Sequence, residues 1–242
     1  MTVTLLIPTI NEMTGLQAVM PRIKPEWCEQ ILVVDGGSTD GTVEYARALG
    51  CQVVLQDRQQ PGLASGCRQA YPFVKGDILI TFSPDGNSIP ELIPALIAKM
   101  KEGYDMVIVS RYLDDAVSHD DDLKSRTGNW VITTLINVCF QAGYTDSLVI
   151  FRAYRRPVVG ELGLLAGGTP VERLCSRLNS WELLSSIRAA KRRLKVGAIP
   201  GSEPSRLGGV SKIPKFRAGL YCLAAIIQEV LLWRYPPARR DQ

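Results

Sequence analysis

Residues 77–88 read D-I-L-I-T-F-S-P-D-G-N-S, and this stretch decides the fold class that the sequence predicts. Its first half is a nearly unbroken apolar run, which is typical of a central strand in a parallel sheet covered on both faces. The run ends at Ser83-Pro84-Asp85-Gly86-Asn87, so a hydroxyl, a carboxylate and an amide follow a buried strand. Ligands of open α/β sheets bind at this edge.

Two interpretations of this strand end stay open from the stretch alone. Its oxygen ligands suit Mg²⁺ or Mn²⁺ holding a diphosphate. Pro, Asp, Gly and Asn are also the usual residues of a β-turn without any ligand. The rest of the chain has to decide between a metal site and an ordinary turn.

Alternation of short β-branched runs with amphipathic helices predicts an α/β fold with a doubly wound, mostly parallel sheet. We expect strands at 3–8, 30–35, 52–55, 77–82, 105–110, 149–155 and 195–199. We expect one helix after a cap at Asn11 or Thr14, one from the turn 36–42 to residue 49, one at 63–70 and one after the capping box Ser88-Ile89-Pro90-Glu91. Further helices are expected at 127–142, through most of 157–193, and at 216–235.

Composition bounds the class of protein. Hydrophobic residues make up 46% and charged residues 21% of the 242 residues, which predicts a packed core. Nine Lys and Arg against one acid, Glu203, lie between 188 and 217. Such a block favours a phosphorylated ligand or an anionic membrane surface. No nucleic-acid motif accompanies the block, so we expect no nucleic-acid partner.

The cysteine pattern indicates a reducing compartment. The six cysteines are scattered without a C-x-x-C pair, which favours free thiols over a disulfide frame or a zinc site. Residues 3–8 begin a strand directly, and we identify no signal peptide. We therefore expect a cytoplasmic protein, and a position on the inner face of the membrane stays open.

Three strand ends carry polar groups that a parallel sheet should bring to one edge. They are Pro8-Thr9-Ile10-Asn11-Glu12, Asp35-Gly36-Gly37-Ser38 and Ser83-Pro84-Asp85-Gly86-Asn87. We expect a nucleotide across the first two ends and its diphosphate and metal at the third. The sequence contains neither G-x-G-x-x-G nor G-x-x-x-x-G-K-[ST], so neither dinucleotide nor P-loop binding is supported.

Six motifs in chain order resemble the family 2 glycosyltransferases of the GT-A fold, and most closely their dolichol- or polyprenyl-phosphate mannosyl- and glucosyltransferase branch. The motifs are I-P-T-I-N-E (7–12), V-V-D-G-G-S-T-D-G-T (33–42), the run 77–85, S-R-Y (110–112), F-R-A-Y-R-R (151–156) and R-L-G-G-V-S-K (206–212). The resemblance covers about residues 3 to 213.

This resemblance implies an inverting transfer from a nucleotide-diphospho-sugar, assisted by Mg²⁺ or Mn²⁺, to a polyprenyl phosphate or another precursor of a cell-envelope glycan. The residues implied for the nucleotide site are Pro8, Thr9, Ile10, Glu12, Asp35, Gly36, Ser83, Pro84, Asp85 and Lys212. Asp85 and Asn87 match the metal ligands. Asp85, Glu182, Arg111 and Arg206 match residues with catalytic roles, and Glu182 is the candidate general base.

Departures from the family pattern give the alternative prediction. The first acid of the family's D-x-D is Ser83, the second acid of its V-V-D-D-G-S is Gly36, and its base-stacking aromatic is Ile10. The alternative is a glycosyltransferase-like binding or scaffold protein with impaired turnover. A nucleotidyltransferase is a weaker third option, because no Gly-rich, Lys-bearing signature follows the first strand.

The C-terminal residues form a separate feature. We expect a glycosyltransferase domain at 1–213, followed by an apolar helix and a basic tail at 214–242. Residues 218–233 span roughly 24 Å as a helix, short of a bilayer core of about 30 Å. Three interpretations stay open: a helix docked on the domain, a contact between two copies in a homodimer, or an interfacial membrane anchor.

Overall fold

The computed structural model describes residues 1–166, 171, 180–207 and 215–231. Its strands are β1 (Val3–Thr9), β2 (Gln30–Asp35), β3 (Gln52–Leu55), β4 (Ile78–Thr81), β5 (Met106–Ser110), β6 (Arg152–Arg155) and β7 (Val196–Pro200). Its α-helices are α1 (Met13–Val19), α2 (Thr42–Ala48), α3 (Leu63–Ala70), α4 (Ile93–Lys101), α5 (Leu123–Phe140), α6 (Arg156–Glu161), α8 (Trp181–Lys191) and α9 (Lys215–Leu231). Short 3-10 turns are η1 (Met20–Arg22), η2 (Pro25–Trp27), η3 (Tyr71–Phe73) and η4 (Pro90–Leu92).

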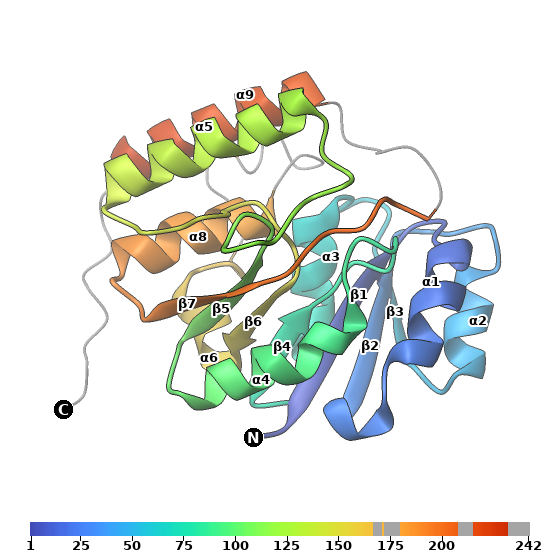
Figure 1. The fold of residues 1–242 in the computed structure, drawn as a ribbon. Coiled ribbons are helices and arrows are strands. Elements are labelled where there is room, and N and C mark those ends of the chain that lie inside the picture. The colour runs from blue at the N-terminus through green and yellow to red at the C-terminus, as the bar shows by residue number, and fades with distance from the viewer. Residues whose placement is uncertain (167–170, 172–179, 208–214, 232–242) are drawn as a thin grey trace.

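The strands form a mixed sheet in the order β3-β2-β1-β4-β6-β5-β7. Only β6 runs against its neighbours, since it pairs antiparallel with both β4 and β5, while the other pairs are parallel. In Figure 1, α4 lies in front of the sheet and α3 behind it. The predicted fold class, a doubly wound and mostly parallel sheet, is confirmed.

Strand β4 is central, as the opening stretch predicts. All four of its residues are buried, and it lies between β1 and β6. The strand ends at Thr81, whose hydroxyl donates to the carbonyl oxygen of Ile150. The Ser83–Asn87 turn therefore starts from a rigid, fully covered strand, which fixes where its polar groups lie.

Helix α8 separates two hydrophobic cores. Trp181, Leu184 and Ala189 pack with the sheet, while Leu183 and Ile187 pack with α5 and α9. Figure 1 shows α5 and α9 side by side on the side of α8 that faces away from the strands. A helix buried on all sides needs no polar face, and α8 has ten buried residues out of eleven.

Helix α9 packs on the domain. Tyr221, Cys222, Ala225 and Ile226 lie in the second core with side chains of α5 and α8. The docked interpretation of the C-terminal helix is therefore what the structure shows, and the dimer and membrane interpretations concern its outer face. Within the described residues, no helix has both the length and the hydropathy required to cross a bilayer. The domain boundary expected at 213 lies outside the described residues.

Some predicted helix starts are wrong. Neither Asn11 nor Thr14 caps α1; Asn11 instead has a left-handed φ of 51° and accepts a hydrogen bond from the amide of Thr39. Ser88 is buried and makes no capping bond, but the helical segment begins at Pro90 as η4, near the predicted start, and continues as α4 from Ile93. Helix α5 begins at Leu123, four residues before the prediction, because Asp122 caps it by accepting from the amide of Ser125.

Candidate active site

A cavity of about 550 Å³ opens at the carboxyl ends of β1, β2 and β4. The sequence predicted that these three strand ends meet, and the parallel register brings them together. Of the residues predicted from sequence, the cavity is lined by Pro8, Thr9, Ile10, Glu12, Gly36, Ser83, Pro84, Asp85, Asn87, Arg111, Glu182 and Arg206. Lys212 lies outside the described residues.

Asp35 lies behind the cavity wall rather than in it. The residue is 1% exposed. Its carboxylate accepts hydrogen bonds from the hydroxyls of Thr9 and Ser38 and from the amides of Gly37 and Ser38. Asp35 thus holds the first two strand ends together, and its predicted contact with a nucleoside stays a prediction.

The wall formed by β1 and β2 is suited to a flat ring. Ile10 is 43% exposed and lies near Gly36. A Cβ atom at position 36 would lie 3.5 Å from Cδ1 of Ile10 and 3.4 Å from Oε1 of Gln56. The glycine that replaces the family's acid therefore widens the slot between Ile10 and Gln56. Gln56 is itself fixed, since its amide nitrogen donates to the carbonyls of Gln60 and Gly62.

The Ser83–Asn87 turn is held from both sides. A Cβ atom at Gly15 of α1 would lie 2.2 Å from the carbonyl oxygen of Pro84, so only glycine permits this approach. On the other side, the amide of Leu207 donates to the carbonyl of Asp85 at 2.9 Å. Gly86 has a φ of +91° and lies against the Leu207 side chain. The turn is consequently wedged between α1 and the segment that follows β7.

Among the described residues, Arg206 forms an ion pair with the predicted metal ligand Asp85. Its Nη2 lies 3.3 Å from Oδ2 of Asp85 and 3.6 Å from Oδ2 of Asp120. Asn87 joins the same group, because its Nδ2 donates to Oδ2 of Asp120 at 3.0 Å. The sequence did not single out Asp120, which lies in an acidic run of the loop before α5.

Asn87 also carries an unusual oxygen. Its Oδ1 is buried and has no hydrogen-bond partner among the residues that the structure describes. An unpaired buried amide oxygen is costly unless something outside the protein satisfies it. Beside the Asp85 carboxylate, it is the kind of hard oxygen donor that Mg²⁺ and Mn²⁺ take. The donor set therefore fits the predicted cation.

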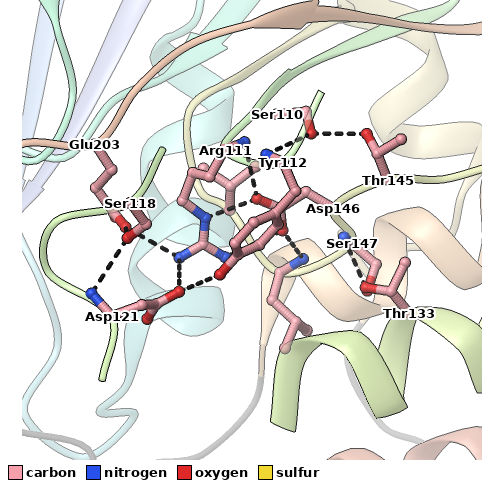
Figure 2. Close-up of polar contacts among 12 residues, drawn as sticks. Ser110, Arg111, Tyr112, Ser118, Asp121, Thr133, Thr145, Asp146, Ser147 and Glu203 are labelled. Atoms are coloured by element: carbon pink, nitrogen blue, oxygen red, sulfur yellow. Dashed lines mark hydrogen bonds and ion pairs between the residues drawn. The ribbon is translucent and has the colours of Figure 1, made fainter. Parts of the chain in front are cut away.

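Arg111 lies at the centre of a charged cluster (Figure 2). Its guanidinium binds Asp146 through two bonds, 2.6 Å from Nε to Oδ2 and 3.0 Å from Nη2 to Oδ1. Its Nη1 lies 3.2 Å from Glu203 and 3.6 Å from Asp121. Burial alone would lower the pKa of Arg111, but the carboxylates outweigh it and raise the pKa. The predicted catalytic Arg111 thus lines the cavity while binding three acids.

Sequence reasoning missed most of these acids. Asp146 lies outside the six motifs quoted above, and Asp121 lies in the acidic run before α5. Glu203 had a usable signal, since it is the one acid in the basic stretch 188–217. A single acid among nine cations is a candidate for a structural ion pair, and Glu203 also accepts from the hydroxyl of Ser118.

Glu182 lies in the first turn of α8 and lines the cavity at 6% exposure. Ser180 caps the helix by accepting from the amide of Leu183, and its hydroxyl donates to Oε2 of Glu182 at 2.8 Å. The helix is anchored from the sheet, because Arg152 on β6 donates to the Glu182 carbonyl. Glu182 is thus a fixed carboxylate at the cavity wall, as its predicted role requires.

Comparisons with known proteins agree with this geometry. The model of the family described as glycosyl transferase family 2 matches residues 4–163. The chain is 28% identical over 228 residues to "Glycosyltransferase AglJ" of Haloferax volcanii, a match that covers 89% of this chain and 71% of that protein.

Solved structures share the fold. Glucosyl-3-phosphoglycerate synthase from Mycobacterium tuberculosis, in complex with Mn²⁺, UDP and glucosyl-3-phosphoglycerate, superposes with a TM-score of 0.67 at 19% identity, over 98% of this chain and 81% of that one. The same enzyme with Mg²⁺ and UDP gives a TM-score of 0.64 at 19% identity, again over 98% and 81%.

Proposed function

The chain belongs to glycosyl transferase family 2, and on this premise we propose that it transfers a sugar from a nucleotide-diphospho-sugar to a lipid phosphate, with inversion and with help from Mg²⁺ or Mn²⁺. The observation that carries the proposal is the cavity at the strand ends, whose lining combines the slot beside Ile10, the oxygen-ligand turn 83–87 and the Glu182 carboxylate. The M. tuberculosis neighbour, which shares the fold, was crystallised with UDP and with Mn²⁺ or Mg²⁺.

Each wall has a part in the proposed reaction. Ile10, Gly36 and Gln56 form the slot for the base. Asp85 and Asn87 would hold the cation, which when bound offsets the negative charge that develops on the departing diphosphate. Arg206 adds a guanidinium at the same place, where charge develops.

The acceptor side is defined by Glu182. If the acceptor is a hydroxyl, the Glu182 carboxylate would accept its proton as the hydroxyl attacks the sugar. An acceptor phosphate is already anionic and needs no such base. In that case Glu182 would act by position, and replacing it by Gln would lower turnover far less than a loss of the general base, which is worth about 10²–10⁴-fold.

The outer face of α5 and α9 supports a lipid acceptor. Helix α9 differs from an ordinary surface helix, because large apolar side chains lie on its outer face as well as in the core, while Gln228 and Glu229 are buried. Exposed apolar side chains on the two helices are Leu123, Trp130, Val131, Val138, Phe216, Leu220, Leu223, Ile227, Val230 and Leu231. A groove of about 630 Å³ runs between the helices, lined among others by Lys124 and Phe216.

We assign this face to a lipid surface. Exposed Trp and basic residues beside an apolar face are typical of interfacial helices. Trp130 is 66% exposed, and Lys124, Arg126 and Arg217 are exposed at the starts of α5 and α9. On this proposal the protein works at the inner face of the membrane in glycan-precursor synthesis, and α9 is its membrane-facing helix.

Donor binding tests the first half of the proposal. Isothermal calorimetry with UDP, GDP, CDP and dTDP and their common sugars, with and without Mn²⁺, should find one base that binds in a metal-dependent way. Asp85→Ala should abolish this binding. Asp115→Ala, an exposed acid of the neighbouring loop, is the matched control and should bind as wild type does. Metal-dependent binding without any sugar transfer would favour the binding or scaffold alternative instead.

Lipid binding tests the second half. The double variant Leu220→Ser with Ile227→Ser removes two outward side chains, 53% and 60% exposed, without entering the core. It should lose sedimentation with anionic liposomes and transfer to a polyprenyl phosphate, while nucleotide binding persists. Leu55→Ser, at 59% exposure on β3, is the control. Wild-type protein that stays in the supernatant would contradict the lipid assignment.

A further inference from the structure

The strand-end turn lacks one carboxylate, and a second loop supplies one. Position 83 is Ser, so the turn itself offers only the Asp85 carboxylate and the Asn87 amide as charged or amide oxygen donors. Asp120 reaches this turn from the loop between β5 and α5, where its Oδ2 accepts from Nδ2 of Asn87 at 3.0 Å. The Asp120 side chain is 30% exposed and therefore keeps access to solvent.

Two carboxylates converge on one guanidinium nitrogen. Oδ2 of Asp85 and Oδ2 of Asp120 approach the same atom, Nη2 of Arg206, at 3.3 Å and 3.6 Å. A cationic group thus already lies between the two carboxylates. Asn87 lies between them as well, since its amide NH donates to Oδ1 of Asp85 while its side chain donates to Asp120.

The unpaired oxygen of Asn87 is the independent sign of a ligand. Asn87 is 8% exposed, and its Oδ1 finds no partner in the described part of the chain although its Nδ2 and backbone NH are bonded. A guanidinium has only donors, yet Arg206 does not satisfy this oxygen. A divalent cation has no directional donor requirement and accepts oxygens at about 2.0–2.1 Å for Mg²⁺.

We propose that Asp120 is the second carboxylate of the divalent-cation site, in place of the acid missing at position 83, and that Arg206 is a resident counter-cation which the metal displaces. Asp85, Asp120 and Oδ1 of Asn87 are then the protein ligands. The proposal rests on the metal-assisted function proposed above and adds to it a ligand from a different loop and a competition between two cations.

The competition follows from charge and position. One guanidinium offsets one of the two carboxylate charges and lies against both oxygens, so an incoming Mn²⁺ has to displace Nη2 before it binds both. Arg206 is held at the site by more than its side chain, because its backbone amide also donates to Oδ1 of Asp120 at 3.3 Å. The guanidinium can therefore leave while residue 206 stays in place, and it then lies beside the diphosphate.

Titration of Mn²⁺ followed by electron paramagnetic resonance tests the ligand. The free Mn²⁺ signal gives affinity and stoichiometry without turnover, both for the protein alone and with the nucleoside diphosphate that binds. Asp120→Asn should weaken Mn²⁺ binding by at least the roughly 10- to 100-fold that loss of an outer partner costs. Asp115→Asn, in the same loop, should leave it unchanged.

Arg206→Gln should change Mn²⁺ affinity in the opposite direction to Asp120→Asn. This variant should bind Mn²⁺ more tightly than wild type in the absence of nucleotide, because the competing cation is gone, and should bind the nucleoside diphosphate with Mn²⁺ more weakly. If Arg206 only stabilised the fold, Arg206→Gln would weaken both the binding of Mn²⁺ alone and the binding of the nucleoside diphosphate. Circular dichroism and urea midpoints should show that the variants fold.

The outcomes separate the two proposals. Wild-type protein that binds no Mn²⁺ under either condition would overturn the metal-assisted function and this inference together. Wild-type binding that Asp120→Asn leaves within about twofold would overturn the role of Asp120 alone, and the metal-assisted function would stand. Equal or weaker Mn²⁺ binding by Arg206→Gln without nucleotide would overturn the counter-cation.

Discussion

Nε of Arg111 lies 2.6 Å from Oδ2 of Asp146, and the same guanidinium reaches Glu203 at 3.2 Å. Through these two contacts Arg111, at the end of β5, is joined to the segment before β6 and to the segment after β7, and all three segments border the cavity. Arg111 is 12% and Asp146 0% exposed at the side chain, so the pair is largely removed from water.

Removing Arg111 should destabilise the protein strongly. Arg111→Ala leaves the carboxylates of Asp146 and Glu203 without their cation, and loss of one partner of a buried pair costs roughly 3–5 kcal/mol. Arg111→Lys keeps the charge but not the two parallel bonds, so its free energy of unfolding should lie between those of wild type and Arg111→Ala. Urea denaturation measures the free energy of unfolding. Arg22→Ala is the control: its pair with Glu91 is exposed and worth about 0–1 kcal/mol.

The pH dependence of stability should carry a signature of Glu203. Burial raises the pKa of this carboxyl above its ordinary 4.5, and Arg111 and Ser118 only partly oppose the effect. The folded protein therefore keeps the proton to higher pH than the unfolded chain, so ionisation of Glu203 lowers the free energy of unfolding as pH rises from 4.5 through the raised pKa. Glu203→Gln should remove this decline, seen in urea titrations at several pH values.

Glu91 serves as a control of opposite sign. The hydrogen bond from Arg22 lowers the pKa of Glu91, so its contribution is present above 4.5 and is lost as pH falls through the lowered value. Glu91→Gln should change the acid limb only. A Glu203→Gln profile parallel to that of wild type from 4.5 upward would contradict the assignment.

Local sequence patterns predicted much of the fold because the decisive information was local. The limits of β2, β3 and α3 agree with the predicted 30–35, 52–55 and 63–70, where alternation and apolar spacing are clear. Helix starts failed where a distant group intervened, as at Asn11, whose side chain binds the amide of Thr39. Residue patterns along the chain do not report such contacts.

The candidate site, like the fold, was predicted from the sequence only in part. Parallel strands bring their carboxyl ends to one edge, so the neighbourhood of Thr9, Gly36 and Asp85 followed from topology alone. Asp120 and Glu203 arrive on loops of irregular shape, whose path the sequence does not specify. The burial of Glu229 on α9 was also missed, because a run that is apolar on all sides does not reveal which face packs on the domain.

Substitution of Gly86 should open the wall beside Asp85. Gly86 has a φ of +91°, and a Cβ atom there would lie 2.5 Å from Cγ of Leu207. Gly86→Ala therefore adds backbone strain of about 1–3 kcal/mol and pushes Leu207 and its neighbour Arg206 away. We expect weaker nucleotide binding by calorimetry and a lower unfolding midpoint.

Gly50→Ala is the control that adds backbone strain without a steric clash. Gly50 has a similar φ of +78°, but a Cβ atom there meets nothing within 4 Å. It should lower the midpoint without changing nucleotide binding. Adding Leu207→Ala to Gly86→Ala should restore part of the binding; no recovery would mean that the Leu207 contact does not position Arg206.

Docking of α9 should depend on one buried acid. Glu229 is 1% exposed and binds Nε of Arg188 at 2.9 Å and Nζ of Lys191 at 2.8 Å. Glu229→Leu removes this buried carboxylate from beside two cations of α8, and loss of one partner of a buried ion pair costs roughly 3–5 kcal/mol. Hydrogen exchange should show α9 losing protection, while β1 and β4 keep theirs. Ile227→Ala, on the exposed face of the same helix, should leave exchange unchanged. If Glu229→Leu left α9 as protected as in wild type, apolar packing around Tyr221 and Ile226 alone would hold the helix, and its buried charges would have no part in presenting the apolar face.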